Sequence, residues 1–112
     1  RRRPISRFHA HTMKIKTYPE TTQELRKIAA FCKQQWSIEI AHRLIETYQR
    51  NKKRLSSNSY MAPIEPLLVN REYVYRGLLI HKYCKVIYRI DETAGIIYIV
   101  DVWDTRREPH EI

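Results

Sequence analysis

Three strand-like segments lie close together near the C-terminal end of the chain, and they constrain the fold more than any other feature. They cover about residues 72–80, 83–90 and 96–103. His81-Lys82 can close a tight hairpin between the first two, and Asp91 to Gly95 forms a turn in which glycine can adopt a positive φ. Because both connections are short, we expect an antiparallel meander.

Two helical patterns precede the meander. Met13 to Tyr18 alternates weakly and predicts a short first strand, after which Pro19 and Glu20 suit the start of a helix over about residues 19–35. Ser37 is a good N-cap for a second helix, whose basic end covers residues 50–54. The short link between the helices predicts an antiparallel helical hairpin, and residues 56–66 read as a loop.

The order of these elements predicts one α+β domain, with an N-terminal strand and a helical hairpin packed on a small, curved, mainly antiparallel sheet. We expect the domain to span residues 13–112. Residues 1–12 have no periodicity and read as a disordered N-terminal extension or a remnant of upstream sequence. His9 and His11 in this segment have no further ligand near them in sequence, so we expect no metal site.

Charge and cysteine content indicate which class of partner and which cellular compartment suit the protein. The formal net charge is +9, and residues 13–112 keep 17 basic against 12 acidic residues, which suits an acidic partner such as nucleic acid or an acidic protein. Cys32 and Cys84 form no CxxC pair, so we expect buried free thiols in a reducing cytoplasm. No apolar run is long enough to span a membrane.

Basic side chains recur on the predicted strands. Strand alternation places Cys84, Val86, Tyr88 and Ile90 on one face of the second strand, which is the better core candidate, and Lys85, Ile87 and Arg89 on the other. The first strand carries Arg76, and Arg106-Arg107 follow the last one. Together these residues are candidates for holding a phosphate backbone, or for forming an ordinary solvated sheet face.

The chain from Met13 onward resembles the RelE/ParE family of bacterial type II toxin–antitoxin toxins. The resemblance rests on an ordered set of segments: Tyr18-Pro19-Glu20, Gln35-Trp36 at the helical bend, Tyr75-Arg76, Lys85 to Arg89, and the ending Ile-Val-Asp-Val-Trp-Asp-Thr-Arg-Arg-Glu-Pro. The helical hairpin is more similar to the ParE and plasmid-stabilisation side of the family. The resemblance implies a cytoplasmic bacterial toxin with an antitoxin partner whose acidic tail wraps and neutralises it, and it implies no cofactor.

Two cellular targets follow from this resemblance. RelE-type members cleave messenger RNA on the ribosome, and in that reading Arg76, Lys85 and Arg107 hold the phosphate while His110 is the candidate acid/base. Arg89 and Arg106 add RNA-binding cations. We expect such an mRNA interferase, although no lysine stands at Leu78, where RelE-type enzymes often carry one. The alternatives are a ParE-type inhibitor of DNA gyrase that does not cut RNA, and a non-toxic basic binding module.

Overall fold

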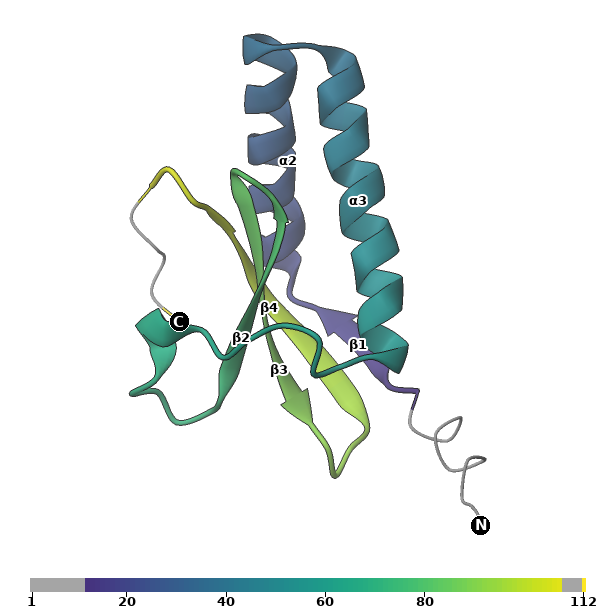
Figure 1. The fold of residues 1–112 in the computed structure, drawn as a ribbon, viewed down its shortest axis with the longest axis vertical. Coiled ribbons are helices and arrows are strands. Elements are labelled where there is room, and N and C mark those ends of the chain that lie inside the picture. Colours follow the sequence, from purple (N-terminus) through teal and green to yellow (C-terminus); the bar gives the residue numbers. More distant parts are fainter. Residues whose placement is uncertain (1–11, 108–111) are drawn as a thin grey trace.

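The computed structural model describes residues 12–107 and 112, and within them two helices pack on a four-stranded sheet (Figure 1). The elements follow in the order β1 (Lys14–Thr17), α2 (Pro19–Gln35), α3 (Ile38–Ser57), the short 3₁₀ helix η1 (Pro66–Leu68), β2 (Tyr75–His81), β3 (Cys84–Asp91) and β4 (Ile96–Asp104). The sheet order is β1-β4-β3-β2. The meander pairs are antiparallel and β1 lies parallel to β4, so the predicted α+β class is confirmed.

The helical hairpin forms where the sequence predicts it. Pro19 lies in the first turn of α2 with Glu20 beside it. The side-chain oxygen of Ser37 accepts a hydrogen bond from the backbone N–H of Ile40 at 3.2 Å, so Ser37 is the N-cap of α3. The helix α3 continues through Ser57, two residues into the segment predicted as a loop.

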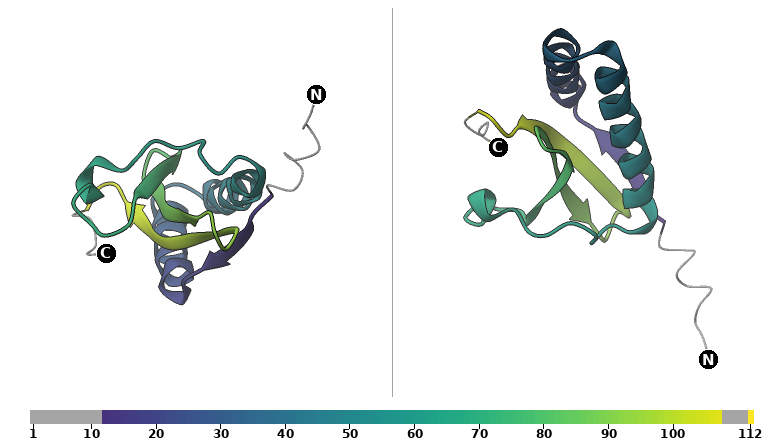
Figure 2. Two further views of the ribbon diagram at one scale, coloured as in Figure 1. Left: turned by 90° about the horizontal axis from the view of Figure 1, so that it is seen from below. Right: turned by 45° about the horizontal axis from the view of Figure 1, so that its top comes forward.

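The main core lies between the helical hairpin and one face of the sheet (Figure 2). The inward stripes of the two helices share this core with alternate residues of β3, namely Cys84, Val86 and Tyr88. In β4 a register shift opposite Ile87 and Tyr88 breaks the alternation, so the core residues there are Ile97, Ile99 and Val102. Cys32 and Cys84 are both free and fully buried there, as predicted. Burial raises the pKa of the Cys84 thiol to about 12, which keeps it protonated.

The opposite face of the sheet is partly covered, which the alternation of β3 alone did not indicate. A second cluster joins Leu68 of η1 to Tyr75, Ile87 and Trp103. The loop that leads to η1 also pairs with the edge of β2, since the Glu65 N–H donates to the Tyr75 carbonyl at 2.8 Å. This pairing holds η1 against the sheet, near the C-terminal Ile112 (Figure 1).

The ends of the strands differ slightly from the prediction. The first meander strand begins at Tyr75 and not at residue 72. Gly95 has a φ of 69°, which confirms the glycine turn before β4. The predicted extension over residues 1–12 lies outside the described residues except for Thr12. Within the described part of the chain, no helix combines the length and apolar character that crossing a bilayer requires.

Candidate functional site

The sheet register places Arg76 and Lys85 on opposite faces. Arg76 pairs with Tyr88, which belongs to the helix-facing core, whereas Lys85 pairs with Trp103 on the other face. The Nη1 of Arg76 donates to the Ala62 carbonyl at 2.6 Å, and its guanidinium lies 4.8 Å from the Tyr60 ring centroid. Arg76 therefore fastens the loop after α3, away from the other candidate cations.

Lys85 is held by a buried carboxylate. Its Nζ lies 2.8 Å from Oε1 of Glu65, whose side chain is only 3% exposed. The other Glu65 oxygen accepts the backbone N–H of Leu67 at 3.2 Å and so caps η1. Both side chains pack over Gly77, where the missing side chain leaves room for them. The positive charge of Lys85 is thus neutralised inside the protein. Sequence reasoning missed Glu65, which lies 20 residues upstream of its partner in a loop.

Arg89 lies between two aromatic rings. Its guanidinium carbon is 4.2 Å from the ring centroid of Tyr73 and 4.2 Å from that of Tyr98. Stacking of this kind stabilises a guanidinium by about 0.5–2 kcal/mol. Lys85, Ile87 and Arg89 are every second residue of β3, so the two cations share the outer face of the sheet with buried Ile87, as predicted.

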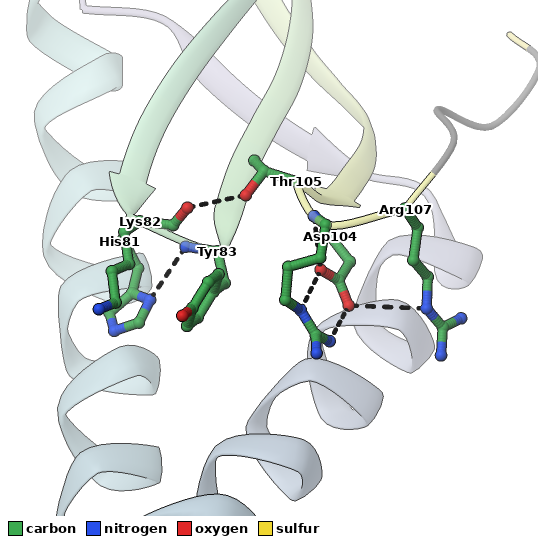
Figure 3. Close-up of polar contacts among 7 residues, drawn as sticks. His81, Lys82, Tyr83, Asp104, Thr105 and Arg107 are labelled. Atoms are coloured by element: carbon green, nitrogen blue, oxygen red, sulfur yellow. Dashed lines mark hydrogen bonds and ion pairs between the residues drawn. The ribbon is translucent and has the colours of Figure 1, made fainter.

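Asp104 organises the basic pair that follows β4 (Figure 3). Oδ1 accepts the Nε of Arg106 at 2.9 Å, Oδ2 contacts Nη2 of the same guanidinium, and the Nε of Arg107 lies 3.7 Å from Oδ2. Burial pushes the pKa of Asp104 upward, but the hydrogen bonds from Arg106 outweigh it and hold the pKa below its usual value. Arg106 is therefore already neutralised, while the side chain of Arg107 remains 70% exposed.

Two of the predicted residues do meet. Lys85 and Arg107 line one small pocket of about 110 Å³, together with Leu67, Trp103, Asp104 and Thr105. The Nζ of Lys85 lies 6.0 Å from the Trp103 ring centroid. The predicted acid/base His110 falls outside the described residues. The pocket thus gathers two cations, each with a carboxylate close by.

A second surface lies at the tip of the helical hairpin. Trp36 stacks on Tyr83 with ring centroids 5.4 Å apart and an interplanar angle of 1°. Phe31 meets Trp36 edge-on at 5.7 Å, and the guanidinium of Arg106 lies 3.5 Å from the Phe31 ring centroid. We call Phe31, Trp36, Tyr83 and Arg106 the tip cluster. Trp36 remains 45% exposed within it.

The tip cluster could not be found from sequence periodicity. Its members come from α2, the bend before α3, the β2–β3 turn and the segment after β4. Hydrogen bonds fix that turn: the Tyr83 N–H donates to Nδ1 of His81, and the Thr105 hydroxyl donates to the Lys82 carbonyl at 2.7 Å (Figure 3). The only sequence signal was a tryptophan at the helical bend.

The part of the chain that the structure describes contains no candidate metal site. Within residues 12–107 and 112, no three His, Cys, Asp or Glu side chains gather in a way that could hold a metal ion. The expectation that the protein uses no cofactor stays a prediction.

A helical hairpin on a four-stranded mixed sheet, with arginines gathered beyond its last strand, defines a small α+β domain. A family model described as "ParE toxin of type II toxin-antitoxin system, parDE" matches residues 15–109. The chain therefore belongs to the ParE toxin family, and the RelE/ParE recognition made from the sequence is confirmed. Membership implies an antitoxin partner.

A solved structure agrees with this assignment. The chain is similar to a structure titled "Chromosomal ParDE TA system from P. aeruginosa", with a TM-score of 0.66, 16% sequence identity, and coverage of 84% of this chain and 97% of that chain. At this identity the likeness supports the fold. Comparison with curated proteins gives no match.

Proposed function

We propose that this chain is a ParE-type toxin that inhibits DNA gyrase in the bacterial cytoplasm and does not cut RNA. The observation that carries the proposal is the state of the candidate cations. Arg76 lies on the opposite face from Lys85, and Lys85 and Arg106 are each paired with a carboxylate of the chain itself. Cleavage of a phosphodiester needs preorganised cations aimed at the developing negative charge.

The Glu65–Lys85 pair makes recruitment of Lys85 costly. Turning Lys85 toward a phosphate would leave the Glu65 carboxylate buried without its partner. Breaking a fully buried ion pair in this way costs about 3–5 kcal/mol. Because Lys85 is partly exposed, we expect breaking the Glu65–Lys85 pair to cost about 1–3 kcal/mol. A phosphate contact would have to offset that loss before it could contribute to catalysis.

An mRNA interferase is the second candidate, and one observation favours it. Lys85 and Arg107 line the same pocket beside Trp103, an arrangement that can hold a phosphate next to a base. In that reading Arg107 is the main phosphate ligand, since its side chain is the more exposed. Arg89 would then add only stacking support.

We assign contact with the target protein to the tip cluster. Tryptophan, tyrosine and arginine are the residues most often found at the energetic centre of protein interfaces, and here all three meet on one exposed surface. Arg106 is already paired with Asp104, so the surface is suited to aromatic packing more than to binding a polyanion. The stacked geometry also means that little side-chain entropy is lost on binding.

The antitoxin, in this proposal, covers the open edge of β2. The loop before η1 hydrogen-bonds to that edge as far as Gly77, and Leu79 beyond it is exposed. An apolar pocket of about 240 Å³ lies beside the same loop, lined in part by Ile64, Val69 and Val74. A strand of the antitoxin added here would bury these side chains and bring its acidic residues near Arg107.

Induced expression in a bacterial host tests the proposed function. We expect growth arrest with intact messenger RNA and an accumulation of gyrase–DNA breaks. Trp36→Ala should weaken target binding by about 30-fold or more, the loss expected for a buried aromatic hot spot. Lys85→Gln should arrest growth as well as the wild type does.

Tyr60→Ala is the matched control, because Tyr60 is an exposed aromatic residue far from the tip. It should retain full toxicity. New 5′ ends at fixed codon positions within minutes of induction, lost in Arg107→Gln, would replace the proposal with the mRNA interferase. Equal losses in Trp36→Ala and Tyr60→Ala would remove the tip cluster from the account.

A further inference from the structure

A lysine-lined groove lies at the end of the molecule opposite the tip cluster. It runs between the edge strand β1 and the second half of α3 and has a volume of about 670 Å³. Its lining residues are Met13, Lys14, Ile15, Gln49, Lys52, Lys53 and Ser56. Figure 1 shows β1 beside the C-terminal end of α3, whereas the hairpin bend lies at the other end of this helix.

Within the described residues, the three lysines of this groove have no carboxylate partner, in contrast to Lys85, Arg106 and Arg107. Among residues 12–107 and 112, ion pairs join Glu24 to Lys27, Glu65 to Lys85, and Asp104 to Arg106 and Arg107, and none of them involves Lys14, Lys52 or Lys53. The Nζ of Lys52 lies 5.6 Å from the centroid of the Tyr48 ring. Their positive charge is therefore available to a ligand.

The basic character continues along α3. Arg50 and Arg54 are exposed, and the hydrogen bonds they donate go to neutral groups, the hydroxyl of Thr47 and the amide oxygen of Asn51. The macrodipole accounts for Arg54 in the last turn of the helix, but its influence falls off within one turn. It gives no reason for Lys14, which lies on a different element.

We propose that this groove binds the phosphate backbone of duplex DNA. Lysine is depleted in protein interfaces, whereas lysine, glutamine and serine side chains are common ligands of DNA phosphates. Its described lining contains all three types and no aromatic ring. Single-stranded nucleic acid is usually held by aromatic stacking, so a lining without rings, as the described residues have it, favours a duplex.

The inference is independent of the proposed function, because it concerns a different surface and needs no gyrase. It assigns the groove between β1 and α3 to a contact with DNA that does not depend on the DNA sequence. About 20 Å of α3 separates Lys52 from the hairpin bend, so a bound duplex leaves the tip cluster open.

Binding of the purified full chain to a labelled duplex, measured by fluorescence anisotropy from about 50 to about 200 mM salt, tests the inference. Each phosphate contact contributes about 0.9 to the slope of log K against log salt concentration. The double variant Lys52→Gln/Lys53→Gln should therefore lower the slope by about 1.8 and weaken binding for every sequence alike. Circular dichroism should show an unchanged fold, since Lys53 is exposed and Lys52 is only partly buried.

Lys33→Gln, combined with Arg26→Gln, is the matched control, because it removes the same charge from exposed positions of α2 and avoids Lys27, which pairs with Glu24. We expect its slope to equal that of the wild type. Equal slopes for the groove variant and the wild type would overturn the inference, as would an equal fall in the control, which would make binding a matter of net charge alone. Tighter binding of polyglutamate than of duplex, dependent on the same lysines, would assign the groove to an acidic protein. Tighter binding of single-stranded DNA would also contradict the duplex.

Discussion

For the substitution Gly77→Ala, the structure predicts a loss of stability, whereas the general behaviour of glycine in strands predicts a gain. A glycine inside a strand normally makes the folded protein less stable than alanine would, by about 0.5–1 kcal/mol. In this chain a methyl group at position 77 would lie 2.6 Å from Oε1 of Glu65 and 2.9 Å from Cδ of Lys85. The lysine stem can move, but Glu65 is fixed by its bonds to Lys85 and to the N–H of Leu67.

The expected magnitude follows from these two effects. Overpacking of a fixed site costs about 1–3 kcal/mol, which exceeds the intrinsic gain, so we expect Gly77→Ala to lower the free energy of unfolding by about 1–2 kcal/mol. Urea unfolding followed by tryptophan fluorescence should then show a midpoint lower by about 0.5–1 M.

A double-mutant cycle separates crowding from other causes. In a Glu65→Ala background the space above position 77 opens, so Gly77→Ala should become neutral or slightly stabilising, with a coupling of about 1–3 kcal/mol. A variant Gly77→Ala as stable as the wild type would refute the geometry of the Glu65–Lys85 pair. The same cost in both backgrounds would show that Glu65 is not the source of the crowding.

Three further predictions follow from the polar and thiol groups. The pKa of Asp104 is depressed in the folded state, so the carboxylate stabilises the fold fully above its ordinary pKa of 3.8. This contribution is lost as the pH falls through the pKa of the folded state. Asp104→Asn should therefore remove this part of the acid dependence of the unfolding free energy, measured between about pH 2 and pH 5. If the two unfolding curves stay parallel over that range, the arginines do not stabilise the carboxylate. Cys32 and Cys84 should resist a thiol reagent at pH 8 until the chain is unfolded, because burial raises both pKa values, and fast labelling of the native protein would contradict this. Tyr73→Ala should destabilise the chain by about 1 kcal/mol through loss of stacking on Arg89, whereas Tyr73→Phe should not; equal losses measured by urea unfolding would point to the hydroxyl instead.

Much of the fold could be predicted because local rules determine it. The cap at Ser37, the proline at the start of α2 and the glycine turn before β4 each depend on neighbouring residues. Alternation likewise gave the inward face of β3 correctly, since Cys84 and Tyr88 are buried against the helices.

The candidate site depended on contacts between distant residues, which periodicity does not encode. Arg76 faces the helices because it pairs with Tyr88, and this register cannot be read from the sequence. Lys85 is neutralised by Glu65, which belongs to an irregular loop. Strand alternation therefore predicted that Lys85 and Arg89 share one face of the sheet, but not which basic side chains have partners inside the protein.

Gyrase inhibition is tested most directly by a supercoiling reaction with purified DNA gyrase and relaxed plasmid, run beside a translating extract that contains a labelled message. We expect the wild-type chain to block supercoiling and to leave the message intact, and we expect Trp36→Ala to lose the block while Lys85→Gln keeps it. A cut message together with unimpaired supercoiling would contradict gyrase inhibition and return Lys85 and Arg107 to the role of phosphate ligands.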